Sequence, residues 1–229
     1  MNNKCMVCKS NPCKCFVKNT GTGNIKIVKT NSDKNIRVVI KTNYDVAHKN
    51  NSVEKVGKHA QNAFSYQSRD HKDEINKTGE RESETGAYKE NGQKMTNEEA
   101  KEYRKSLKDV GGFRRIILSP DPKYNLSKED LKDITEKVLE DYRKLNTNKE
   151  YKATFAIHTD TEVKHTHILL TSKKGSNIKW KKEDLKTFKE IAKNRIEEKI
   201  REKEKEQSIF RIFKREEKRE RENTQSRGL

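Results

Sequence analysis

The segment 154–172, TFAIHTDTEVKHTHILLTS, holds three of the six histidines of the chain. These are His158, His165 and His167, with Asp160 between the first two. Three neutral imidazoles on a rigid support can bind a divalent metal and leave coordination positions open for a substrate. A nearby carboxylate can fix the tautomer of one ligand. The spacing predicts a metal site formed by the three histidines; the alternative is three unrelated histidines on a polar sheet surface.

A β-hairpin is the element that would bring the three rings together. Side chains on a strand alternate between the two faces of a sheet, so His165 and His167 point to the same face. With a turn centred near Thr161 and Glu162, His158 lies directly opposite His165 and shares that face. Pairing of His158 with His167 also keeps the rings together, whereas a register shift of one residue would move His158 to the opposite face.

The charge of the chain indicates the kind of partner. The 229 residues carry a formal net charge of +17, which favours a polyanion such as nucleic acid or an anionic membrane. No run of 18 apolar residues occurs, so we expect no membrane span. The first residues, MNNKCMVCKSNPCKCF, lack the apolar region of a signal peptide. We therefore expect a cytoplasmic protein with reduced thiols.

A phosphodiester substrate would explain both the charge and the metal. A bound cation can neutralise a phosphate oxygen in the transition state, and either water or a side chain can attack. A tyrosine hydroxyl can serve as the nucleophile if a cation or a base lies close by. Of the seven tyrosines, Tyr66 is the best candidate because Arg69 follows one helical turn later and can contact phosphate.

Alternating strand and helix patterns surround these residues. Hydrophobic periodicity and capping residues predict the boundaries, and residues 70–95 are expected to form a long polar loop. The expected strands are 24–30, 35–44, 113–121, 152–159 and 164–172, and the expected helices begin near Ser52, Thr96 and Ser127, with one long charged helix after Lys173.

Three segments resemble a known family. His158, Asp160, His165 and His167 form the H-x-D…H-x-H pattern of the HUH endonucleases, and the chain is similar to the conjugative relaxases, the MobA/VirD-like mobilisation nucleases. FRRIILSPD resembles their arginine-led strand ending in Ser-Pro-acidic, and HAQNAFSYQSRD resembles their tyrosine motif. The order of the segments is also that of the family. Many relatives have proline before the H-x-H pair, where this chain has Lys164.

This resemblance implies a fold and an activity. The fold class is α+β, a central antiparallel sheet with flanking helices. The activity is site- and strand-specific nicking of DNA at an origin of transfer, with Tyr66 attacking a phosphate to form a 5′-phosphotyrosyl link. The histidines would bind Mg²⁺ or Mn²⁺, and Asp160 would orient a ligand or help to deprotonate the tyrosine. Arg69, Arg114 and Arg115 would contact DNA, and accessory mobilisation proteins and a coupling protein would be further partners.

All four cysteines lie near the N-terminus, in the pattern C-x2-C-x4-C-x-C. Four thiolates within so short a segment can complete a tetrahedral Zn²⁺ site, and a cytosolic context makes disulfides a weaker explanation. An iron–sulfur cluster or free thiols are the alternatives. The predicted structural zinc ligands are Cys5, Cys8, Cys13 and Cys15.

The chain is expected to divide into three parts. Residues 1–17 form the zinc segment, 18–172 the nuclease domain and 173–229 a basic helical tail. The tail is interpreted as a solvated helix with i,i+4 charge pairs, or alternatively as a helix that binds DNA or a partner.

Two other functions compete with the relaxase interpretation. A rolling-circle replication initiator uses the same histidine pair, but in many of those proteins the tyrosine follows the histidines, and no tyrosine follows Tyr151 here. A non-catalytic, zinc-bearing nucleic-acid-binding protein would have the same positive charge without any nicking activity.

Overall fold

The computed structural model describes residues 15–20, 24–29, 36–68, 86–159 and 163–226. The chain forms two compact units, Met1–Ile36 and Arg37–Leu229. In the first unit, β1 (Cys15–Thr20) pairs antiparallel with β2 (Asn24–Lys29). Cys15 thus begins a strand inside the expected zinc segment, and Cys5, Cys8 and Cys13 lie outside the described residues.

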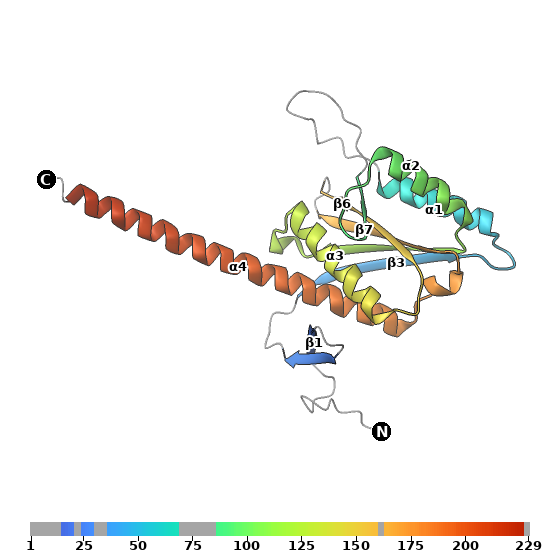
Figure 1. Ribbon diagram of the computed structural model, residues 1–229, viewed down its shortest axis with the longest axis horizontal. Helices are drawn as coiled ribbons and strands as arrows, with labels where there is room; N and C mark the ends of the chain where they lie inside the picture. The colour runs from blue at the N-terminus through green and yellow to red at the C-terminus, as the bar shows by residue number, and fades with distance from the viewer. Residues whose placement is uncertain (1–14, 21–23, 30–35, 69–85, 160–162, 227–229) are drawn as a thin grey trace, which may run out of the picture. The chain divides into compact units, whose positions relative to one another are not determined.

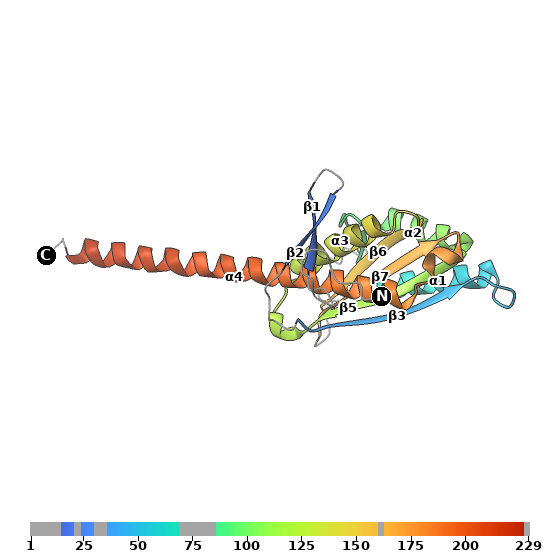
Figure 2. The same cartoon turned by 90° about the horizontal axis from the view of Figure 1, so that it is seen from below.

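The second unit is built on a five-stranded sheet in the order β3-β5-β7-β6-β4 (Figure 1). All four pairings are antiparallel, and β3 forms one edge of the sheet, as Figure 2 also shows. The strands are β3 (Val38–Val46), β4 (Ala87–Lys89), β5 (Gly112–Pro120), β6 (Lys152–His158) and β7 (His165–Ser172). The expected antiparallel α+β fold is confirmed.

Within the described residues, four helices and three short 3-10 turns flank this sheet. Figure 1 shows α1 next to α2 and α3 next to α4, so the helices form two pairs. The helices are α1 (Val53–Gln67), α2 (Asn97–Ser106), α3 (Lys128–Leu145) and α4 (Lys182–Ser226), and the turns are η1 (Leu107–Asp109), η2 (Pro122–Tyr124) and η3 (Gly175–Ile178).

The two helix pairs contact opposite faces of the sheet. Gln67, the last residue of α1, donates from Nε2 to the hydroxyl of Thr154 at 3.2 Å. Thr135 of α3 donates to the hydroxyl of Thr166 at 3.3 Å. Leu169 is directly opposite Thr154, so Thr154 lies on the odd-numbered face of β7 and Thr166 on the other. His165 and His167 therefore lie on the face that α1 covers.

The helix starts that the sequence predicts are confirmed. Ser52 caps α1, and its side chain accepts a hydrogen bond from a backbone N–H of the first turn. Thr96 and Glu99 form a reciprocal capping box at the start of α2, as do Ser127 and Asp130 at the start of α3. Each cap satisfies backbone donors that have no partner within the helix, which fixes where the helix begins.

A buried cluster between α1, η1 and the sheet holds α1 in place. Gly57 permits the closest approach, because a Cβ there would collide with the carbonyl oxygen of Lys108. The cluster consists of buried apolar side chains that include Val56, Ala60, Ala63, Phe64, Leu107, Phe113 and Leu169. Helix α1 is therefore rigidly placed above β5 and β7.

The prediction that residues 70–95 form one long loop is wrong for its last part, which contains a strand. Residues 69–85 lie outside the described part of the chain, but β4 follows them and pairs with β6. Ala87 is fully buried, and the ring of Tyr88 stacks on Phe155 with centroids 5.2 Å apart. Three residues are too few to show a period of two, so the pattern in the sequence could not reveal this edge strand.

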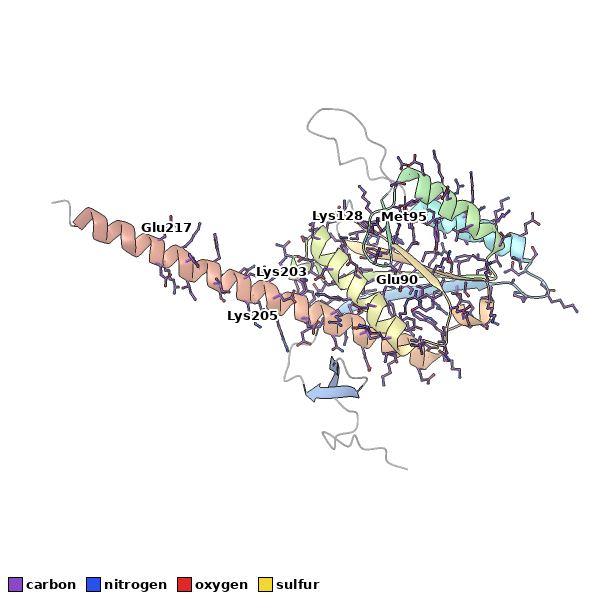
Figure 3. The ribbon with its side chains drawn as sticks, in the orientation of Figure 1. Glu90, Met95, Lys128, Lys203, Lys205 and Glu217 are labelled. Atoms are coloured by element: carbon purple, nitrogen blue, oxygen red, sulfur yellow. The ribbon has the colours of Figure 1, made fainter. Side chains whose placement is uncertain are left out.

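Helix α4 packs on α3 through its first half. Phe188, Ala192 and Ile196 are buried, and the ring of Phe188 meets that of Tyr142 edge-on at 5.3 Å. Lys203 still reaches Asp130 at 2.6 Å, whereas residues 204–217 are exposed. Figure 3 labels Lys203 at the end of this contact, and Lys205 and Glu217 along the exposed part that follows. No helix in the described ranges is apolar over enough residues to cross a membrane.

Candidate functional site

The three histidines come together on the β6–β7 hairpin. His158 is directly opposite His165, in the first of the two registers that the sequence allows, and His167 follows on the same face. One ring nitrogen from each histidine lies within 4.8 Å of the others. The ring centroids are 4.5 Å apart for His158 and His167 and 4.9 Å for His165 and His167. The hairpin thus gathers three imidazoles on one sheet face.

A hydrogen bond orients the ring of His165 as an ion would require. Nδ1 of His165 donates to the backbone oxygen of Val163 at 2.9 Å, which leaves the lone pair on Nε2. That Nε2 lies 3.1 Å from Nε2 of His167. Two nitrogens that bind one ion at about 2.1 Å are about 3.0 Å apart at an octahedral angle and about 3.4 Å apart at a tetrahedral one. The donor set therefore fits a divalent metal.

His158 connects the hairpin to the end of α1. Its side chain is buried, with 3% exposed, and Nε2 donates to the backbone oxygen of Gln67 at 3.1 Å. A carbonyl oxygen can only accept, so Nδ1 of this ring keeps the lone pair for an ion. Nothing in the sequence singles out Gln67, because a helix-end carbonyl contacts the hairpin only in the folded chain.

Tyr66 lies beside the histidines at the end of α1. Its ring centroid is 5.7 Å from that of His167, edge-on, and 6.4 Å from that of His158. Even so, 52% of the residue is exposed, so a strand of DNA can reach the phenol. The chemical combination is an accessible hydroxyl next to a site for a cation.

Arg114 and Arg115 point to opposite faces of β5. Arg115 is exposed on the histidine face, and its Nε donates to Oδ1 of Asn43 at 3.0 Å. Arg114 is 3% exposed; its guanidinium donates to the backbone oxygen of Ile178 and stacks over the ring of Trp180 at 4.5 Å. This burial lowers the pKa of Arg114 and does not favour the expected contact with DNA.

Several predicted site residues lie outside the described residues. They are Asp160, Arg69 and three of the four cysteines. The roles expected of them stay predictions, as does the zinc site.

A cleft beside Tyr66 extends the site towards the sheet edge. It has a volume of about 480 Å³ and is lined by residues of α1, β3 and β5 that include His59, Asn62, Asp45 and Arg115. His59 belongs to the segment that resembles the tyrosine motif, but its pairing partner on β3 is distant in sequence and carried no recognisable signal.

The fold and this site define a class of protein. An antiparallel sheet whose neighbouring strands carry His158 and the pair His165 and His167 next to a tyrosine-bearing helix is the architecture of an HUH endonuclease. The family model for the MobA/VirD2-like nuclease domain of relaxases matches residues 66–207, more than half of the chain, and the chain belongs to this family. No curated protein and no solved structure matches the chain. Family membership makes it a DNA-binding nuclease of the kind that nicks DNA for mobilisation.

Proposed function

We propose that this protein nicks one strand of DNA at an origin of transfer, with Tyr66 as the nucleophile and a divalent cation held by His158, His165 and His167. The observation that carries the proposal is the position of the Tyr66 ring, whose centroid is 5.7 Å from that of His167. The match of residues 66–207 to the relaxase nuclease domain supports the nicking of DNA.

The proposed reaction is a transesterification. The phenol oxygen of Tyr66 attacks the scissile phosphorus, and the bond from phosphorus to the 3′-oxygen breaks. The phenol gives up its proton, and the departing 3′-oxygen takes one to become a free hydroxyl. The products are a 5′-phosphotyrosyl link and a 3′-hydroxyl end. Because one phosphoester bond replaces another, the reverse reaction can reseal the strand.

A bound Mg²⁺ or Mn²⁺ would neutralise charge on the phosphate in the transition state. The three imidazoles would hold it, with His165 already fixed in the required tautomer by Val163. The hydrogen bond from His158 to Gln67 keeps the end of α1, and so Tyr66, next to the cation site. Asp160 is proposed to orient a ligand or to accept the phenol proton.

Basic side chains on the histidine face would position the DNA backbone. Arg115 is exposed there and donates from Nε to Asn43, so its terminal nitrogens point towards the site and can bind a phosphate. Arg69 is proposed as a second phosphate contact. Arg114 is omitted from this surface because it lies buried on the opposite face.

The remaining parts of the chain are proposed to serve recognition. Residues 18–172 would form the nuclease domain. Residues 1–17 would bind one structural Zn²⁺ through four thiolates. Residues 173–229 would contact DNA, or accessory mobilisation proteins and a coupling protein. A chelator should release about one equivalent of zinc per chain. Recovery of folded, metal-free protein would contradict the zinc assignment.

The nicking assay tests the function directly. Supercoiled plasmid carrying the cognate origin is incubated with Mn²⁺, and we expect nicked circles with protein attached to the 5′ end. Tyr66→Phe should abolish nicking while DNA binding persists. The matched control is Tyr124→Phe. Tyr124 lies on the 3-10 turn η2, and its hydroxyl accepts a hydrogen bond from the backbone N–H of Arg37, so its loss should leave nicking intact.

Two outcomes would overturn the assignment. Normal nicking by Tyr66→Phe means that another residue is the nucleophile. Binding without nicking by the wild-type protein, on every origin tested, favours a non-catalytic DNA-binding function.

A further inference from the structure

The cleft beside Tyr66 contains a polar side-chain arrangement that the nicking reaction does not use. Nδ1 of His59 lies 2.8 Å from Oδ2 of Asp45. The other oxygen of this carboxylate, Oδ1, accepts from Nδ2 of Asn51 at 2.7 Å, and the same amide also donates to the backbone oxygen of Val46. The histidine is thus held by an anchored carboxylate.

This arrangement fixes which nitrogen of His59 is left for a ligand. An ionised carboxylate only accepts, so Nδ1 carries hydrogen in the pair. The side chain is 47% exposed, and within the described residues no hydrogen bond to Nε2 is found. Asp45, which also lines the cleft, is hydrogen-bonded through both oxygens, to Asn51 and to His59.

His59 and Tyr66 lie on the same side of α1. They are seven residues apart, which is close to two helical turns and about 10.5 Å along the axis. Asn62 and Ala63 fill the intervening turn and line the same cleft. A single strand whose scissile phosphate meets Tyr66 would therefore bring a neighbouring phosphate to His59.

Arg115 completes the opposite wall of the cleft. It is exposed, and Asn43 holds its Nε, so the planar guanidinium presents its terminal nitrogens. In its imidazolium form His59 keeps Nδ1–H on Asp45 and has a second donor, Nε2–H, for a ligand. An imidazolium and a guanidinium that face one cleft suit a phosphodiester better than a base edge, because both donate to anionic oxygens. His59 and Asp45 both precede the residues matched by the relaxase family, which start at Tyr66.

We infer that His59, positioned by Asp45 and Asn51, binds a phosphate of the single strand adjacent to the scissile one and sets the register of the DNA on Tyr66. The inference rests on the proposed function, which supplies the strand and the scissile phosphate. Asp45 is a positioning residue: it acts only through the imidazole.

Replacing one phosphate at a time by an uncharged linkage locates this contact. A series of single-stranded oligonucleotides spans the nick site, and each carries one methylphosphonate at a different position. Their binding to the Tyr66→Phe variant is measured by fluorescence anisotropy. At one position next to the scissile phosphate, we expect the neutral linkage to weaken binding about tenfold. In the His59→Gln variant of that background, the same linkage should change binding less than about twofold, since a partner already removed cannot be lost again.

Matched variants separate the contact from a structural role. Asp45→Asn should reduce the methylphosphonate effect at the same position and at no other. His48→Gln changes a histidine in the turn before α1 that bonds the N–H of Asn50, and it should keep the full tenfold effect. An oligo(dT) strand, which needs no nick site, gives a second measurement: His59→Gln should bind it more weakly than His48→Gln does.

The possible failures are distinguishable. If Tyr66→Phe abolishes nicking but His59→Gln keeps the full methylphosphonate effect, the nuclease assignment stands and this inference is wrong. If no nicking occurs at any origin and His59→Gln binds oligo(dT) as tightly as His48→Gln, both proposals are wrong. Weaker oligo(dT) binding by His59→Gln without nicking would keep the phosphate contact and overturn only the tyrosine chemistry.

Discussion

The buried imidazole of His158 donates a hydrogen bond to the backbone oxygen of Gln67, at 3.1 Å. The last carbonyls of a helix have no partner within it, and here a ring of the histidine triad supplies one. The residue before Gln67 is Tyr66. One hydrogen bond therefore connects the hairpin that carries the proposed cation ligands to the helix end that carries the proposed nucleophile.

Replacing His158 should disturb both parts of the site at once. His158→Ala leaves a buried cavity and an unsatisfied carbonyl, so we expect a loss of about 2–3 kcal/mol in the free energy of unfolding. His165→Ala, at a half-exposed position, should cost less than about 1 kcal/mol. Both variants should lose Mn²⁺ binding. Urea unfolding and calorimetric titration measure the two effects, and equal stability of the two variants would contradict the connecting role of His158.

Gln67 is expected to position Tyr66 through its side chain as well. Its buried amide donates to Thr154 at 3.2 Å, so Gln67→Ala should slow single-turnover nicking about tenfold while the affinity for DNA changes little. Gln61 on the same helix donates to the backbone oxygen of Arg104 and faces away from the hairpin, which makes Gln61→Ala the control. Parallel losses in both variants would mean that the effect is general to α1.

Removing the cation should stop nicking without unfolding the protein. We expect EDTA to abolish nicking and Mn²⁺ to restore it, because the site supports the reaction and not the core. Mn²⁺ at one hundred times its dissociation constant should stabilise the folded chain by about 2.7 kcal/mol, measured as a rise in Tm. The double variant His165→Ala with His167→Ala should show no such rise; an unchanged rise would place the cation elsewhere.

The sequence was sufficient to predict the hairpin because side chains on a strand alternate with a period of two, which places His165 and His167 on one face. Their spacing allowed two registers, and the one in which His158 pairs with His165 is found. Lys164, just before the second strand of the hairpin, donates from Nζ to the backbone oxygen of Leu126 and so connects the hairpin to the segment that precedes α3. Capping residues located three helix starts for a similar reason, since a cap acts within four residues.

Features that depend on contacts between distant segments could not be predicted. Alternation along β5 implies that Arg114 and Arg115 diverge, but only the packing of Trp180 decides which guanidinium is buried. The pairing of Asp45 with His59 likewise joins a strand and a helix whose register with each other no local pattern encodes. The candidate ligands and the candidate nucleophile are therefore recognisable in the sequence, whereas the residues that hold or surround them are not.

The two neighbouring arginines should have different roles. Arg115→Gln should weaken binding to single-stranded DNA and lower the slope of log K against log salt by about 0.7, the value for one phosphate contact on a single strand. Arg114→Met should leave that slope unchanged and reduce Tm, since it removes a buried hydrogen bond to Ile178. Salt titrations of oligo(dT) binding and thermal melts check both. A reduced salt slope for Arg114→Met would show that Arg114, too, contacts a phosphate of the DNA.

Acid should loosen the packing of α4 on α3. Burial raises the pKa of Asp133, but the hydrogen bonds and charges of Lys199 and Lys137 together lower it by a larger amount. The pKa of Asp133 in the folded chain therefore lies below its ordinary value. Such a group stabilises the folded state above its unfolded pKa and loses that contribution as the pH falls through the folded one. We expect the free energy of unfolding to decline from about pH 5 downwards, with about 1 kcal/mol of the decline absent in Asp133→Asn. Glu140→Gln, an exposed residue of the same helix paired with Lys144, is the control. Urea unfolding followed by circular dichroism between pH 7 and about pH 3 measures the profiles, and identical slopes for wild type and Asp133→Asn would show that this carboxylate does not couple α4 to the pH.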